Sequence, residues 1–143
     1  MSFQPRDYHT VSPYLLVADP AKLIDFMQTV FEATEIERHS RPDGSIGHAE
    51  VKIGDSIVMM GGVSGDEWKA TAASLYVYLP DVDAAYARAL KAGATSVMEP
   101  SLQFYGDKMG GIKDPADNLW WIATHVKDVS KEEIARIARE RNS

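Results

Sequence analysis

The stretch Tyr105–Val126, YGDKMGGIKDPADNLWWIATHV, decides the fold. It predicts a hairpin, because a tight turn at Asp114–Asn118 separates one short strand from a second one at Leu119–Thr124. Trp120 and Trp121 are neighbours on the second strand, so their side chains must point to opposite faces of the sheet. We therefore expect one indole in the core and the other on the opposite face, the side toward which the sheet curves.

The composition is that of a single cytoplasmic domain. The chain has 143 residues, 45% of them hydrophobic, and at this size a core forms without a disulfide or a metal. It contains no cysteine, which excludes disulfide scaffolds and thiol chemistry. The formal net charge of −6 argues against a nucleic-acid partner. No apolar run approaches the roughly 18 residues of a membrane span, so we expect no membrane association.

The order strand, helix and three strands occurs twice along the chain. In the first half we expect strands at Thr10–Val17, Glu35–Ser40, Ile46–Ile53 and Ser56–Met60, with a helix that begins at Asp19-Pro20. In the second half we expect a strand at Ser74–Leu79, a helix capped by Asp81 or Asp83, a strand at Thr95–Met98 and the hairpin at Tyr105–Thr124. A polar, glycine-bearing linker over residues 61–71 separates the halves.

This repetition predicts an α+β fold of two tandem βαβββ modules that bury their faces together. The modules span about residues 8–62 and 72–128, and together they form one domain over residues 1–128. Ser130 and Glu133 then form a capping box, which predicts a helical extension over residues 129–143. The arginines of this extension alternate with glutamates, as in a solvated helix.

Four segments resemble one protein family: VADPAKLIDFM, YVYLPDVDAAYARALKAGA, GHAEVKIGDSIVMM and GDKMGGIKDPADNLWWIATH. Over about residues 8–128 the chain resembles the vicinal oxygen chelate superfamily, and more narrowly its PhnB-like, glyoxalase/bleomycin-resistance-like branch. The superfamily holds glyoxalase I, extradiol dioxygenases, fosfomycin-modifying enzymes and bleomycin-binding resistance proteins. The resemblance implies a homodimer or pseudo-dimer whose curved sheets wrap a cavity, and it does not imply one activity.

Enzymes of this superfamily hold a divalent metal through four inward side chains, usually His or Glu. The resemblance places Ser12, Met59, Leu75 and Trp121 at these four positions. Hydroxyl, thioether, alkyl and indole groups supply no charge to offset the dehydration of a divalent ion. We therefore expect that the usual metal centre is absent and that no other cofactor replaces it.

Without the metal, the same positions describe a small-molecule cavity with apolar and aromatic walls and a few hydroxyls. The candidate lining residues are Ser12, Tyr14, His48, Glu50, Met59, Leu75, Val77, Tyr105, Lys108 and Trp121. The alternative is that Met59, Leu75 and Trp121 fill this space as a packed core. Lys108 either binds an anionic substrate or forms an ion pair with a carboxylate, Asp107 or Glu50.

His48 and Glu50 are the best candidates for catalytic residues. They are two apart on a predicted strand and so share one face, opposite the apolar residues that alternate with them. Three roles are open: a solvated pair at the rim, a general base (Glu50) with a polar anchor (His48), or two ligands of a displaced divalent metal site. In the last case His125 or His9 would be the third ligand.

Two functions are compatible with these features. The first is a metal-independent protein that binds a small hydrophobic or aromatic molecule and sequesters it, as bleomycin-resistance proteins do. The second is a lyase, isomerase or dioxygenase that acts on a small metabolite through Glu50 and His48, with or without a metal. No nucleophile constellation and no phosphate-binding glycine loop supports a third class.

Overall fold

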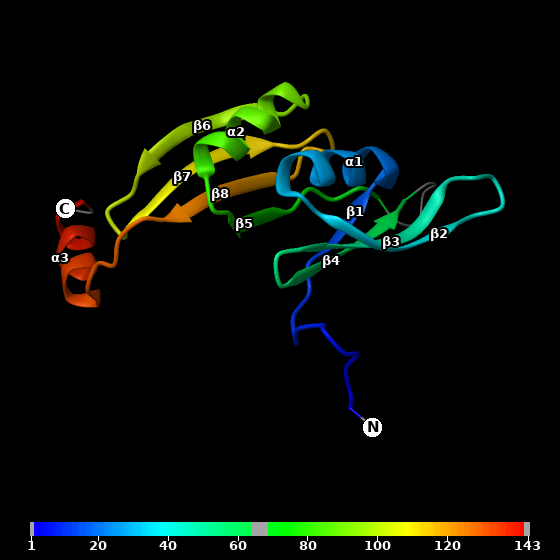
Figure 1. Ribbon diagram of the computed structural model, residues 1–143, viewed down its shortest axis with the longest axis horizontal. Coiled ribbons are helices and arrows are strands. Elements are labelled where there is room, and N and C mark those ends of the chain that lie inside the picture. Colours follow the sequence, from blue (N-terminus) through cyan, green and yellow to red (C-terminus); the bar gives the residue numbers. More distant parts are fainter. Residues whose placement is uncertain (1, 64–68, 142–143) are drawn as a thin grey trace.

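The computed structural model describes residues 2–63 and 69–141, which form two four-stranded sheets with three helices (Figure 1). The first module comprises β1 (Tyr14–Val17), α1 (Pro20–Phe31), β2 (Thr34–Ser40), β3 (Ile46–Ile53) and β4 (Ser56–Gly62). The second comprises β5 (Ser74–Tyr78), α2 (Val82–Lys91), β6 (Thr95–Leu102), β7 (Asp107–Lys113) and β8 (Leu119–His125). Their strand orders, β1-β4-β3-β2 and β5-β8-β7-β6, are equivalent. The α+β fold of two tandem βαβββ modules is confirmed.

The two module helices begin in the same way. The side chain of Asp19 accepts a hydrogen bond from the backbone nitrogen of Lys22 at 3.2 Å, and the side chain of Asp81 accepts one from Ala84 at 3.1 Å. Asp81, rather than Asp83, is therefore the cap of α2. Because both caps satisfy the N–H of the third helical residue, they fix which residues of the two modules are equivalent.

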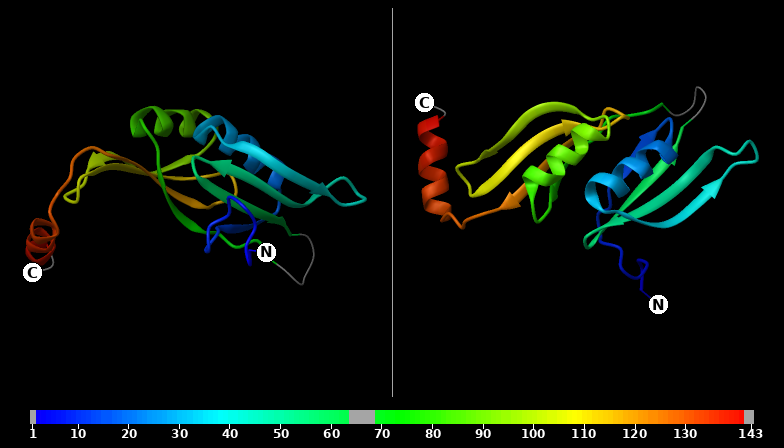
Figure 2. Two further views of the ribbon diagram at one scale, coloured as in Figure 1. Left: turned by 60° about the horizontal axis from the view of Figure 1, so that its bottom comes forward. Right: turned by 45° about the horizontal axis from the view of Figure 1, so that its top comes forward.

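Each sheet is covered by a helix on one face only. Helix α1 packs on β2, β3 and β4, and α2 packs on β6, β7 and β8, while the two helices contact each other. Both helices lie on the same side of the pair of sheets (Figure 2). We call the side of each sheet that is turned away from its helix the open face.

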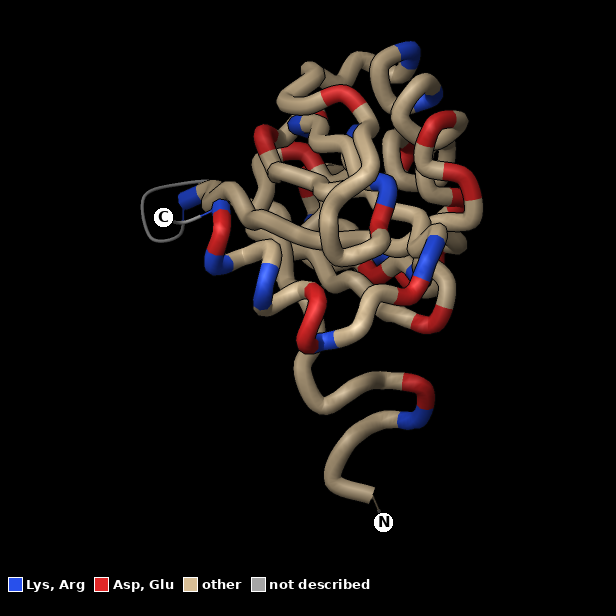
Figure 3. The backbone as a smooth tube through the Cα atoms, turned by 90° about the vertical axis from the view of Figure 1, so that its left-hand side faces the viewer, with Lys and Arg blue, Asp and Glu red and all other residues tan. Residues whose placement is uncertain are grey.

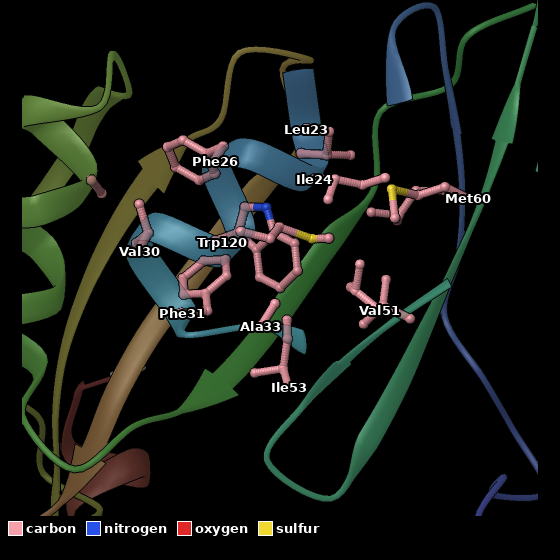
Figure 4. Close-up of a cluster of buried hydrophobic side chains, with 14 of the residues drawn as sticks. Leu23, Ile24, Phe26, Val30, Phe31, Ala33, Val51, Ile53, Met60 and Trp120 are labelled. Atoms are coloured by element: carbon pink, nitrogen blue, oxygen red, sulfur yellow. The ribbon is translucent and has the colours of Figure 1, made fainter. Parts of the chain in front are cut away.

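The core joins the modules through Trp120. This residue of β8 is 1% exposed, and its ring centroid lies 4.6 Å from that of Phe31 at the end of α1. Figure 4 shows the indole among the apolar side chains of α1, which belongs to the other module. Trp121 is only half-buried and lies on the open face, so the prediction that the two indoles separate is confirmed.

The Asp114–Asn118 turn holds Trp120 in place. Asp114 is buried, and its carboxylate accepts hydrogen bonds from the indole nitrogen of Trp120 at 2.8 Å and from the Asn118 amide nitrogen at 3.0 Å. It also accepts bonds from the backbone nitrogens of Ala116 and Asn118. The side-chain oxygen of Asn118 in turn accepts a bond from the backbone of Ala73, next to β5. One buried carboxylate thus connects the turn, the core indole and the start of the second module.

The first strand is shorter and more exposed than expected. We expected a strand over Thr10–Val17, but β1 begins after Pro13, and Tyr14 is 53% exposed. Proline lacks the N–H that a strand needs, and β1 lies at the edge of its sheet, where such a residue is tolerated. Of the expected linker, Gly61 and Gly62 belong to β4, and residues 64–68 lie outside the described residues.

Helix α3 (Lys131–Arg141) extends from the end of the second sheet (Figure 2), and the guanidinium of Arg141 lies over the ring of Phe104, 5.1 Å from its centroid. The hydroxyl of Ser130 accepts a bond from the backbone nitrogen of Glu133 at 3.1 Å, as the capping box predicts. Arg136 forms ion pairs with Glu133 and Glu140, and both signs of charge alternate along the helix (Figure 3). Within residues 2–63 and 69–141, no helix combines the length and the apolar character needed to cross a membrane.

Replacing Asp114 with Ala should lower the free energy of unfolding by about 3 kcal/mol, because the buried indole and amide donors lose their acceptor. Urea unfolding measures this change. Asp117→Asn is the matched control, since Asp117 is exposed in the same turn and has a left-handed backbone (φ 66°) that Asn also adopts. The control should change the stability by less than about 0.5 kcal/mol. Equal effects of the two substitutions would contradict the role of Asp114.

Candidate functional site

The strand register determines which side chains share the open face. In the first sheet Tyr14 pairs with Met59, Met59 with Glu50, and Glu50 with Glu37, so these four residues form one row across all four strands. The alternate residues of the same strands, such as Ala49 and Val51, are buried beneath α1. The prediction that His48 and Glu50 lie opposite these apolar residues is therefore confirmed.

Two hollows flank Tyr14. One, of about 500 Å³, lies between β1 and β5, and its lining includes Ser12, Tyr14, Ser74 and Tyr76. We call it the junction hollow. The other, of about 510 Å³, lies on the far side of Tyr14 and is lined in part by Arg41. Both volumes fall in the range of about 300–1,000 Å³ that is typical of small-molecule sites.

The register of β5 differs from the one we assigned. Ser12 lies seven residues before the helix cap Asp19, and the residue seven before Asp81 is Ser74, not Leu75. Leu75 is half-buried against the core, and it is also one of the residues that line the junction hollow. A shift of one residue on a strand reverses every side chain, so this correction exchanges the two faces of β5.

The same shift removes Val77 from the candidate cavity. Val77 packs against the core beside Leu75, whereas Tyr76 and Tyr78 point to the open face, where they are 42% and 62% exposed. Sequence analysis missed these two tyrosines. The equal spacing from each strand to its helix cap was the signal that would have found them.

With this correction, the resemblance places Ser12, Met59, Ser74 and Trp121 at the four metal positions of the superfamily. None of these side chains carries an imidazole or a carboxylate, and the correction from Leu75 to Ser74 adds only a neutral hydroxyl. This set does not fit a divalent ion, which needs anionic oxygen or imidazole ligands.

Trp121 lies beside the junction hollow and does not line it. A Cβ atom built on Gly111 would lie 2.7 Å from a ring carbon of Trp121, so the indole rests directly on the backbone of β7. Gly111 thus provides the close approach that glycine allows. A side chain of the protein itself therefore occupies the space that this glycine leaves.

Glu50 is the centre of a polar cluster on the first open face. It is 3% exposed, its Oε2 lies 2.8 Å from Nε2 of His48, and its Oε1 accepts a hydrogen bond from the hydroxyl of Tyr8. Burial acts to raise the pKa of Glu50, but the hydrogen bonds from His48 and Tyr8 lower it overall. The bond to Glu50, aided by burial, raises the pKa of Tyr8 to about 12.

Glu37, rather than His125 or His9, completes this cluster. The carboxylate of Glu37 and the ligand atoms of His48 and Glu50 lie within 4.8 Å of one another. Nε2 of His9 lies 2.8 Å from the carbonyl oxygen of Asp55, and His125 belongs to the second sheet. Neither histidine is the third member that we expected. Sequence reasoning missed Glu37 and Tyr8, because cross-strand register and the path of the N-terminal arm have no local signature.

A second buried carboxylate, Asp107, organises the open face of the second sheet. It is 2% exposed and accepts hydrogen bonds from the hydroxyls of Tyr76 (2.6 Å) and Tyr78 (2.9 Å) and from Nδ1 of His125 (2.8 Å). Burial acts to raise the pKa of Asp107, but these three bonds lower it overall. The hydroxyl of Tyr105 lies 3.4 Å from that of Tyr76, so Tyr105 joins the same face.

Lys108 does not belong to either open face. Its Nζ lies 2.7 Å from the carboxylate of Asp83 at the start of α2, on the side of the sheet that the helix covers. The expected pairing with Asp107 or Glu50 is wrong, since alternation along β7 directs Lys108 and Asp107 to opposite faces.

Comparison with known proteins identifies the family to which this chain belongs. Residues 8–122 match the model of the Glyoxalase/Bleomycin resistance protein/Dioxygenase superfamily. The chain belongs to this superfamily, which is the vicinal oxygen chelate superfamily indicated by the sequence. An uncharacterized protein of Mycobacterium bovis, Mb0911c, is 36% identical over 134 residues, which cover 87% of this chain and 88% of the relative. Protein Rv0887c of Mycobacterium tuberculosis is also 36% identical, over 87% of this chain and 79% of the relative.

Solved structures share the fold at lower identity. TioX from Micromonospora sp. ML1 is 24% identical with a TM-score of 0.68, over 82% of this chain and 99% of that one. A PhnB protein from Bacillus cereus is 16% identical with a TM-score of 0.65, over 81% of this chain and 99% of that one. Likeness at this level supports the fold alone.

Replacing Asp107 with Asn should destabilise the protein at neutral pH and have less effect in acid. The folded-state pKa of Asp107 is lower than the unfolded value of about 3.9. Its stabilisation is therefore present above that value and is lost as the pH falls through the folded-state pKa. Urea unfolding at a series of pH values from 7 to 2 measures the difference between the wild type and the variant.

Tyr78→Phe should lower the stability in the same direction but more weakly, because it removes one of the three donors to Asp107.

A stability difference between the wild type and Asp107→Asn that does not vary with pH would contradict the prediction. It would show that the charge of the carboxylate contributes nothing to the free energy of unfolding.

Proposed function

We propose that this protein binds a small, flat and largely uncharged molecule in the junction hollow and sequesters it. The observation that carries the proposal is the pair of exposed tyrosines, Tyr14 and Tyr76, on the two strands that border the hollow, with the hydroxyls of Ser12 and Ser74 beside them. An aromatic ring is stabilised when its apolar surface is removed from water. Exposed rings that border one hollow therefore indicate that a ligand binds there and covers them.

The lining of the hollow defines the chemistry of the ligand. Within the part of the chain that the structure describes, every residue that lines the junction hollow is uncharged. Aromatic contacts with the tyrosine rings contribute roughly 0.5–1.5 kcal/mol each beyond the buried area. The serine hydroxyls can donate and accept hydrogen bonds, which would orient a ligand with one or two polar groups.

The hollow beyond Tyr14 would admit one charged substituent. Arg41 lines it, and its guanidinium group donates hydrogen bonds to the carbonyl oxygens of Ile46 and Gly62. Because Tyr14 is exposed and borders both hollows, rotation of its ring would connect them into one longer cavity. A neutral aromatic body with an anionic end is the ligand class that fits both parts.

We propose further that two copies of the chain pair through their open faces. The exposed rings of Tyr14 and Tyr76, which border the junction hollow, lie on the open faces, and a second copy laid on this side would close the hollow. Tyr78, 62% exposed, would be covered in the same step. A dimer agrees with the architecture that the superfamily resemblance implies. Sedimentation should give the mass of two chains, and a monomer at micromolar concentration would contradict the pairing.

Catalysis is the second candidate function, and the contact between Glu50 and His48 favours it. The 2.8 Å bond orients the imidazole, and His48 is the more exposed of the two, so its ring rather than the Glu50 carboxylate would meet a substrate. His48 would then act as the general base of a lyase or isomerase, with Glu50 as its positioning residue. This reverses the roles that we assigned from sequence.

A thermal-shift screen of aromatic metabolites and antibiotics tests binding. A ligand at 100 times its dissociation constant should stabilise the protein by about 2.7 kcal/mol. Tyr14→Ala should weaken the dissociation constant of such a ligand at least tenfold, because it removes a wall of both hollows. Trp121→Ala should weaken it less, since the indole borders the site from β8.

Val126→Ala is the control, since Val126 is exposed and lies after β8. If no compound stabilises the protein, or if every variant retains the full shift, binding in the junction hollow is refuted. Mass spectrometry of the incubated ligand separates the two functions: an unchanged ligand supports sequestration, and a product that forms in the wild type but not in His48→Gln supports catalysis.

A further inference from the structure

The cluster around Glu50 brings together two carboxylates and an imidazole that the junction hollow does not use. Glu37 on β2 and Glu50 on β3 are register partners on the open face, and His48 precedes Glu50 by two residues. Each of the three offers one ligand atom, and these atoms lie within 4.8 Å of one another. Nε2 of His48 and Oε2 of Glu50 are already 2.8 Å apart.

Two carboxylates face each other here, and a cation between them would offset their negative charges. Like charges directly opposite each other on neighbouring strands repel. Glu50 is buried, so water screens the repulsion poorly. Among residues 2–63 and 69–141, no lysine or arginine forms an ion pair with Glu37 or Glu50, and their partners are His39 and His48. A metal ion would supply positive charge at this point, in addition to the hydrogen bonds that Glu50 makes with His48 and Tyr8.

We propose that Glu37, His48 and Glu50 bind a divalent transition-metal ion. Tetrahedral coordination at about 2.1 Å places ligand atoms about 3.4 Å apart, so small side-chain rotations would bring the three atoms to that spacing. A mixed set of one imidazole and two carboxylates suits ions such as Zn²⁺ and Co²⁺. Three protein ligands leave one position for water or a substrate oxygen.

Two neighbouring side chains would orient the ligands without contacting the ion. The Tyr8 hydroxyl holds Oε1 of Glu50, which leaves Oε2 for the metal. Nε2 of His39 lies 3.1 Å from Oε2 of Glu37. Hydrogen bonds of this kind fix the orientation of metal ligands and raise metal affinity. Tyr8 and His39 are thus positioning residues of the proposed site.

The site is independent of the proposed ligand function. None of its three ligands lines the junction hollow, and none occupies the four positions that hold the metal in other members of the superfamily. Metal binding and aromatic-ligand binding can therefore fail separately, because each is measured with its own probe. Glu37→Gln tests the metal site alone, whereas His48→Gln also affects the proposed catalytic alternative.

The experiment begins with protein purified without a chelator and without a metal-affinity tag. Elemental analysis should find about one divalent transition metal per chain. Metal-free protein should bind Zn²⁺ with one-to-one stoichiometry by calorimetry, and Co²⁺ should give an absorption band of a four-coordinate ion with nitrogen and oxygen ligands.

Glu37→Gln and His48→Gln should each weaken the Zn²⁺ dissociation constant at least tenfold and change the Co²⁺ spectrum. Glu37 is half-buried on an edge strand, so Glu37→Gln keeps the fold even if substitutions of the buried Glu50 do not, and circular dichroism verifies this. Tyr8→Phe should weaken binding by a smaller factor, as expected of a positioning residue.

Glu35→Gln and His9→Gln are the matched controls. Glu35 is exposed on the same strand and pairs with Arg38, and His9 contacts the carbonyl of Asp55. Both controls should bind Zn²⁺ as the wild type does. The proposal is overturned if the wild type binds no metal at a one-to-one ratio, or if Glu37→Gln and His48→Gln bind it unchanged.

Discussion

The contact between Trp120 and Phe31 is the constraint on which the arrangement of the two modules depends. The indole comes from the last strand of the second module, and the phenyl ring comes from the end of the helix of the first. Asp114 fixes the indole from the turn side. Arg88 of α2 adds a second link between the modules, since its guanidinium donates to the carbonyl oxygen of Val30 at 2.8 Å. With both helices held on one side, the other faces of the two sheets are left without cover.

This one-sided packing explains why the polar clusters lie on the open faces. Among the described residues, each open face has one buried carboxylate, Glu50 in the first sheet and Asp107 in the second. Glu50 is held by a histidine and one tyrosine hydroxyl, and Asp107 by a histidine and two tyrosine hydroxyls. Burying a charge is tolerated when several donors compensate it. Between the two faces, where β1 and β5 approach, the lining is uncharged, and there the proposed ligand would bind.

The sequence predicted the modules well, because helix caps and strand alternation are local signals. Asp19 and Asp81 cap the helices as expected, and Trp120 and Trp121 separate as neighbours on a strand must. The candidate site was predicted less well. On β5, apolar and aromatic residues alternate without a polar marker, so the faces of Leu75 and Tyr76 could not be told apart by hydrophobicity. The pairing of Glu37 with Glu50 depends on cross-strand register, which includes a β-bulge in β2 and cannot be deduced from either strand alone.

Whether the hollow between the two modules binds a small aromatic molecule is answered by a crystal structure of the protein with a compound that stabilises it. We expect density for the compound between Tyr14 and Tyr76, within hydrogen-bond distance of Ser12 or Ser74. A bound compound located elsewhere, with the junction hollow filled by the rings of Tyr14 and Tyr76, would contradict this expectation.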